Sequence, residues 1–254
     1  MPATTPHVLY CGDTTLQSAA GYLAGLLTRA GWNYTYIPSD DSLPAEALDS
    51  DWNVIVLSDY PAARLTAAQH SAIVQRVQHG AGLLMIGGWE SFHGLGGDWD
   101  GTEVGGILPV QIASADDRFN CDQLLVARCC RPHPIVNGLP WDTRPPLLGG
   151  LNRVVPKPNS QVLLTAEQWN LRRAGDTLSL QRDASHPLLV VGESAAGRTA
   201  AFASDVAPHW IGPMVDWGLP RVMATAPDAA AIEVGSQYAE FFTRLVAWSA
   251  GGVS

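Results

Sequence analysis

The sequence WNVIVLSDYP at residues 52–61 is the strongest indication of a fold class in this chain. Its apolar centre at 54–57 is continuous rather than alternating, which is typical of a parallel strand with helices packed on both of its faces. The run ends in Ser58 and Asp59, two polar residues that would lie where the strand leaves the sheet. The stretch therefore predicts a central strand of an α/β domain.

Strand and helix patterns alternate on both sides of this run. Short apolar segments predict strands, and longer segments with apolar residues at helical spacing predict helices. The predicted strands lie at 7–13, 33–38 and 81–88, and the predicted helices at 15–31 and 67–80. This alternating order predicts a mostly parallel, doubly wound sheet.

The pattern changes in the middle third of the chain, between about 107 and 200, where short strands are broken by Pro and Gly. Two of these strands, at 187–194 and 197–204, predict a hairpin. A closing amphipathic helix is predicted at 238–251. No repeat or linker divides the sequence, so we expect a single domain over 1–254.

The composition limits the classes of function. The chain has 254 residues, 46% of them hydrophobic, and a formal net charge of −9 that would repel a phosphate backbone. No apolar run is long enough for a membrane span, and residues 1–7 do not resemble a leader. We therefore expect a cytoplasmic protein that contacts neither nucleic acid nor membrane.

No cofactor or metal is predicted. The four cysteines, Cys11, Cys121, Cys129 and Cys130, lack the spacing of a metal site, and reduced thiols are expected. The GLGG sequence at 94–97 is not followed by Lys-Ser or Lys-Thr, so it is not a phosphate-binding loop.

Three segments carry a resemblance to a known family: GGWESFHGLGG (87–97), HPIVNGLP (133–140) and GRTAAFASDVAPHW (197–210). In order and spacing they resemble the class I glutamine amidotransferase-like superfamily, in particular its "putative glutamine amidotransferase" branch and, more distantly, the trehalose-utilisation-like proteins. The resemblance implies a flavodoxin-like three-layer sandwich, with added strands from the middle third at one edge or end of the sheet.

The resemblance also shows where the family's chemistry is missing. Family members carry a nucleophilic cysteine in a G-x-C-x-G turn after the equivalent strand, where backbone N–H groups stabilise the oxyanion. The matching residue here is Trp89, which cannot attack a carbonyl. In the family's second motif, His209 matches the base, but Ile211 stands in place of the acid. Glutamine hydrolysis by the cysteine route is therefore not expected.

Ligands of open α/β sheets bind beyond the carboxyl ends of the strands, so polar residues there are the candidate site. Asp13 follows the first strand and is more simply a helix cap. The catalytic candidates are Glu90, His209 and Asp205, and the candidate ligand-binding residues are Asp59, Trp89, Ser91, His93 and Trp210. Each has a structural alternative: the aspartates and Ser91 as caps, Glu90 as a helix-start charge, and His93 as a surface residue.

Trp89, Trp99 and Trp210 are expected in the same neighbourhood, where exposed indoles would suit stacking on a sugar or another flat ligand, although tryptophans more often pack in cores. Three hypotheses about function follow. The chain is an enzyme that performs hydrolysis or proton transfer on a small polar or carbohydrate-like substrate, an inactive ligand-binding module, or a homo-oligomeric structural subunit.

Overall fold

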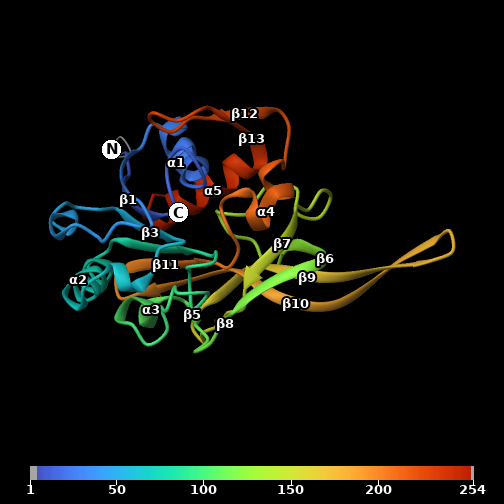
Figure 1. Cartoon of the computed structure of the whole chain (residues 1–254), viewed down its shortest axis with the longest axis horizontal. Coiled ribbons are helices and arrows are strands. Elements are labelled where there is room, and N and C mark those ends of the chain that lie inside the picture. Colours follow the sequence, from blue (N-terminus) through green and yellow to red (C-terminus); the bar gives the residue numbers. More distant parts are fainter. Residues whose placement is uncertain (1–4, 253–254) are drawn as a thin grey trace.

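The computed structural model describes residues 5–252, and Figure 1 shows them arranged around one large sheet. The sheet has nine strands in the order β2-β1-β3-β4-β11-β10-β9-β6-β7. Its parallel half contains β1 (His7–Gly12), β2 (Asn33–Ile37), β3 (Val54–Ser58), β4 (Gly82–Ile86) and β11 (Gly197–Phe202). Its antiparallel half contains β6 (Arg118–Cys129), β7 (Leu147–Asn152), β9 (Gln161–Ala174) and β10 (Thr177–Ser194).

Helices cover both faces of the sheet and complete three layers (Figure 1). One face is covered by α1 (Ala20–Arg29), α4 (Pro208–Val215) and α5 (Ser236–Ser249). The other is covered by α2 (Ala67–Gln78) and α3 (Glu103–Ile107). A separate apolar core fills each interface, which explains why β3 and β4 are buried along their whole length. The predicted α/β sandwich is confirmed.

The smaller elements connect these layers. The 3₁₀ helices η1 (Ala45–Leu48) and η2 (Ala62–Arg64) flank β3. Two short antiparallel pairs lie outside the main sheet: β5 (Val110–Gln111) with β8 (Val155–Pro156), and β12 (Arg221–Ala224) with β13 (Ile232–Gly235).

The predicted strands and helices of the first half are confirmed, each with its ends shifted by a few residues. α2 begins as predicted after Thr66, whose hydroxyl accepts the Gln69 N–H while the Gln69 side chain accepts the Thr66 N–H at 2.9 Å. The hairpin of β10 and β11 is also confirmed. No sequence pattern predicted α3, β7, β8, α4, β12 or β13, or the full length of β9 and β10.

The sequence predicts neither a leader nor a membrane span, and the structure bears on these two expectations to different extents. The expected lack of a leader at 1–7 falls largely on residues outside the described range. Within residues 5–252, no helix is both long and apolar enough to cross a bilayer.

Candidate functional site

The predicted site lies at the carboxyl end of the parallel half of the sheet, in the turn after β4. Gly87 and Gly88 open this turn, and a side chain at either position would collide with its surroundings. A Cβ atom on Gly88 would lie 2.1 Å from Oδ1 of Asp59, and one on Gly87 would lie 2.6 Å from Oδ1 of Asn152. The glycines are therefore needed because polar side chains from other strands pack directly against the turn.

Asp59 occupies the inside of the turn. Its Oδ1 accepts the backbone N–H of Glu90 at 2.8 Å, and the Trp89 N–H also stabilises its charged form. Burial raises the pKa of Asp59 from 3.8 to about 6, although both N–H groups oppose the rise. The N–H groups that would stabilise an oxyanion after a nucleophile at position 89 thus already bind a carboxylate of the protein itself.

Ser91 lies on the buried side of this turn and connects it to β3 and β4 by hydrogen bonds. Its side chain is 1% exposed, and its hydroxyl donates to the Ile86 carbonyl at 2.6 Å. The same hydroxyl accepts the backbone N–H of Asp59 at 2.9 Å. Both hydrogen bonds are internal, so the structure places Ser91 as a brace between β3 and β4 and not on an open surface.

Trp89, the residue that the sequence resemblance aligns with the nucleophile, lies at the surface with 41% of its area exposed. Its indole N–H donates to Nε2 of His209 at 2.8 Å, and the Arg118 guanidinium lies 4.5 Å from the ring centre. Asp116 holds Arg118 in place through two hydrogen bonds of 2.9 and 2.8 Å. Nε2 of His209 is therefore engaged as the acceptor of the Trp89 hydrogen bond.

Three carboxylates gather beneath this surface. Asp13 and Asp205 are 1% and 4% exposed, and Asp59 interacts electrostatically with both. Burial first, and then the neighbouring acids, raise the pKa of Asp13 well above its usual value and that of Asp205 to about 8. The carboxyl ends of the parallel strands thus bring together three of the four acids selected from the sequence.

Hydrogen bonds hold two of these acids in fixed positions. Asp205 accepts the N–H groups of Val206 and Ala207 through Oδ1, at 2.6 and 2.9 Å. Asp13 accepts the Tyr10 hydroxyl through Oδ2, but its Oδ1 is buried without a hydrogen-bond partner. The acids therefore share a buried environment in which protonated forms are favoured.

The three catalytic candidates are not linked to each other. Glu90 is partly buried, and burial followed by the nearby Asp40 raises its pKa, while Arg64 opposes the rise. No hydrogen bond or ion pair joins Glu90, Asp205 and His209 within residues 5–252.

The other two tryptophans expected at the site, Trp99 and Trp210, are core residues. Trp99 is fully buried and donates its indole N–H to the Tyr60 carbonyl at 2.8 Å. Trp210 is 2% exposed, packs on Gly150 and donates to Oδ1 of Asn120 at 2.7 Å. Of the three indoles expected at the site, only Trp89 is available for stacking.

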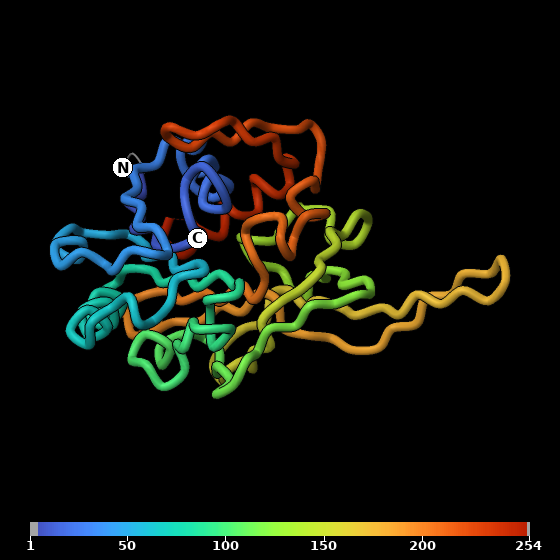
Figure 2. Tube along the Cα trace, in the orientation of Figure 1, coloured from blue at the N-terminus to red at the C-terminus, as the bar shows by residue number. Residues whose placement is uncertain are grey.

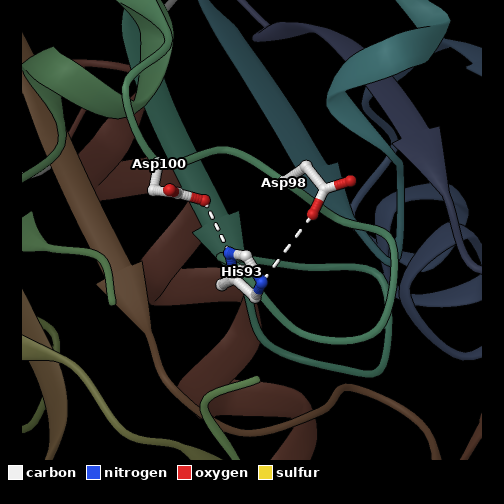
Figure 3. Close-up of side chains that lie close together, drawn as sticks. All are labelled: His93, Asp98 and Asp100. Atoms are coloured by element: carbon white, nitrogen blue, oxygen red, sulfur yellow. Dashed lines mark hydrogen bonds and ion pairs between the residues drawn. The ribbon is translucent and has the colours of Figure 1, made fainter. Parts of the chain in front are cut away.

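His93 has two carboxylates beside it, which makes this cluster the candidate metal centre among the described residues (Figure 3). Its Nδ1 lies 2.6 Å from Asp100 and its Nε2 lies 3.9 Å from Asp98. Because the two acids face different ring nitrogens, one ion could take His93 and Asp98 as ligands, with Asp100 orienting the ring. The hydrogen bond to Asp100 raises the pKa of His93, which favours an ion pair over a metal site.

Sequence reasoning missed Asn152 and Asp117, which fix the turn from the antiparallel half. Asn152 accepts the Gly88 N–H at 2.9 Å and donates to the Gly88 carbonyl at 3.1 Å and to Asp117 at 2.8 Å. Asp117 accepts the N–H groups of His93 and Gly94. The only sequence signal for Asn152 was its place at the end of an apolar segment. Its partners, Gly88 and Asp117, lie far away in the chain, so no local pattern connects them.

The comparisons with known proteins agree with this fold. Residues 13–221 match the family described as "Putative glutamine amidotransferase". Two cytoplasmic proteins of Salmonella typhimurium have similar structures, each with a TM-score of 0.72 and 24% identity. The alignments cover 95% of this chain and 98% of the first protein, and 96% of this chain and 99% of the second.

The N-terminal domain of mmIFT52 is also similar, with a TM-score of 0.60 and 11% identity over 95% of this chain and 96% of that domain. At these identities the likenesses concern the fold alone. No curated protein matches the sequence.

Proposed function

The chain belongs to the family described as "Putative glutamine amidotransferase", and from that premise we propose that it keeps the family's fold but binds a small ligand at the turn after β4 instead of hydrolysing glutamine. One observation carries the proposal: Asp59 accepts the Glu90 N–H at 2.8 Å, beneath a tryptophan at the position of the nucleophile. A turn with neither a thiol nor a free oxyanion donor lacks both parts of the acyl-transfer reaction.

The remaining thiols support the same proposal. Burial in β1 strongly raises the pKa of Cys11, so its thiolate is not formed near neutral pH. Cys121 and Cys129 lie on β6, and Cys130 directly follows it, in the antiparallel half of the sheet. None of these cysteines replaces the missing nucleophile.

The ligand surface would be the exposed face of Trp89. Its ring is kept in one orientation by the hydrogen bond to His209 and by the stacked Arg118. A ring held this way loses little conformational entropy when a flat ligand stacks on it, which favours sugars, nucleosides and other ring-containing molecules. The ligand class inferred from the sequence, a small polar or carbohydrate-like molecule, is consistent with this surface.

The hydrolytic part of the proposal is tested by ammonia release from glutamine. We expect no release above the buffer blank, and the same result for His209→Ala. Release by the unmodified protein that His209→Ala abolishes would overturn the proposal and make the chain an enzyme.

The binding part is tested by thermal shift and calorimetry with glutamine, nucleosides, monosaccharides and disaccharides. A ligand of the expected class should raise the melting temperature by mass action. Trp89→Ala should weaken its affinity about tenfold through lost stacking and burial. Leu95→Ala is the matched control, because Leu95 is also an exposed apolar side chain, with 57% of its area exposed. This variant should leave the affinity unchanged. If none of these compounds binds, the proposal fails.

A proton-transfer enzyme is the second candidate, and the buried acids favour it. Asp59 and Asp205, with pKa values of about 6 and 8, would both change protonation near neutral pH. This candidate predicts a reaction whose rate falls in Asp205→Asn but not in Trp89→Ala, which separates it from the stacking surface.

The name of the two Salmonella neighbours supports a cytoplasmic location, which we also propose for this chain.

A further inference from the structure

The strands β9 and β10 continue beyond the rest of the sheet as a two-stranded arm. β6 pairs with β9 only as far as Trp169, whereas β9 and β10 pair with each other up to the contact of Ala174 with Thr177. Figures 1 and 2 show this arm projecting away from the body of the molecule. Every residue from 171 to 183 is exposed. An isolated two-stranded ribbon is marginally stable in water, so an arm of this length calls for a partner.

One face of the arm is apolar and has no cover. Leu171 lies directly opposite Leu180, and the next position on that face pairs Leu178 with Arg173. Residues opposite each other in an antiparallel pair point to the same side, so the three leucines form one stripe. They are 46%, 55% and 63% exposed for Leu171, Leu180 and Leu178.

The stripe leads into a hollow at the base of the arm. The hollow has a volume of about 330 Å³, and its apolar lining includes Leu124, Val126, Trp141, Trp169 and Leu180. Trp169 precedes Leu171 on the same face of β9. The apolar side chains and the hollow that could receive them are therefore continuous on one surface.

We propose that this surface joins two copies of the chain, with the leucines of each arm packed into the hollow at the base of the other arm. A surface that carries both the projection and the recess is complementary to itself, which is the requirement for a two-fold contact. Each copy can therefore form the contact with this one surface, without a different surface on its partner.

Charge favours a second copy over other occupants. Residues 171–183 contain three arginines and two aspartates, a formal charge of +1, whereas the whole chain has a formal net charge of −9. An arm that carries positive charge is attracted to the acidic body of another copy. The same acidic body would oppose adsorption to an anionic membrane, which an arm with leucines and arginines could otherwise favour.

The proposal is tested by sedimentation equilibrium of the full chain across a dilution series. We expect a monomer–dimer equilibrium. The double variant Leu178→Glu, Leu180→Glu should raise the dimer dissociation constant by on the order of 100-fold, because two buried leucines become charged groups at the contact. The double variant Ser179→Glu, Gln181→Glu is the matched control: it adds the same two negative charges but on the opposite face of β10, and should leave dimerisation nearly unchanged.

Thermal unfolding of each variant, compared with the parent protein at a dilution where all are monomeric, shows whether the monomer is intact. A parent protein that stays monomeric at every concentration would overturn the proposal, as would a dimer that the leucine variants do not weaken. Co-sedimentation with phosphatidylserine vesicles that depends on the leucines would overturn it in favour of a membrane surface.

Discussion

Replacing Asp205 by asparagine should stabilise the protein at alkaline pH. The carboxyl group is 4% exposed, and burial together with Asp59 raises its pKa to about 8. Only Oδ1 accepts the two backbone N–H groups, so an asparagine can keep both hydrogen bonds through its own oxygen. The substitution therefore removes the ionisable group with little change in the local structure.

The direction and size of the effect follow from the difference in pKa between the folded and unfolded chains. An unfolded aspartate has a pKa near 3.9, so the folded state holds a proton that the unfolded state releases. Its stabilising contribution is complete below about pH 4 and is lost as the pH rises through about 8. At about 1.4 kcal/mol for each pH unit, the loss by pH 8 is roughly 5 kcal/mol if Asp205 titrates alone.

The neighbouring acids share this titration, so a gain of roughly 2–5 kcal/mol is expected for Asp205→Asn at pH 8 and almost none at pH 4. For a chain of this size the gain corresponds to at least about 4 °C in melting temperature. Asp122→Asn, at an exposed position on β6, is the control. Thermal unfolding of the three proteins between pH 4 and 9 is the assay. If the melting temperatures of Asp205→Asn and of the parent protein change in parallel between pH 4 and 9, the reasoning is refuted.

Four further substitutions test the turn after β4 and the packing of the fold. Thr66→Ala should cost about 1 kcal/mol in urea unfolding because α2 loses its cap. Gly88→Ala should destabilise the fold by at least about 1–3 kcal/mol, since its Cβ would meet the Asp59 carboxylate, and calorimetry measures this. Trp89→Cys should not create glutaminase activity, because the nearby Asp59 disfavours a thiolate; iodoacetamide labelling should be slow at pH 7. Trp210→Ala should cost about 3–5 kcal/mol in urea unfolding as a buried ring is lost.

The parallel half of the fold could be predicted because its signals are local. The continuous apolar run of β3, and the helix that starts at Thr66, depend on residues that are neighbours in the sequence. The same topology places the carboxyl ends of parallel strands at one edge, which is why Asp13, Asp59 and Asp205 could be expected near each other.

The antiparallel half gave weaker signals. β7 contains two adjacent glycines, and its place at the sheet edge depends on pairing with β6. The outer parts of β9 and β10 are exposed on both sides and are mostly polar, apart from three leucines and Ala174. Such segments have little to distinguish them from loops until their register is known.

The same limit applies to the orientation of the candidate site residues. Ser91 and Trp210 stand beside motif positions, but sequence proximity does not say which way a side chain points. Packing decided the outcome: Trp210 fills the space over Gly150, and Ser91 turns inward to join Ile86 with Asp59. Asn152, which hydrogen-bonds both the N–H and the carbonyl of Gly88, could not be identified because it lies 64 residues away from Gly88.

The two departures from the family's chemistry that the sequence predicts depend on each other in physical terms. A carboxylate in the position of Asp59 would repel both a thiolate at residue 89 and the oxyanion formed from a substrate, so it is incompatible with acyl transfer there. With an indole at residue 89 no negative charge develops, and the carboxylate can instead satisfy the Glu90 N–H. The indole is in turn held by His209, the residue that the sequence resemblance aligns with the family's base. In the function that we propose, groups that would otherwise make and break bonds fix the orientation of an exposed ring, which is why we infer a binding surface at this turn and not a catalytic one.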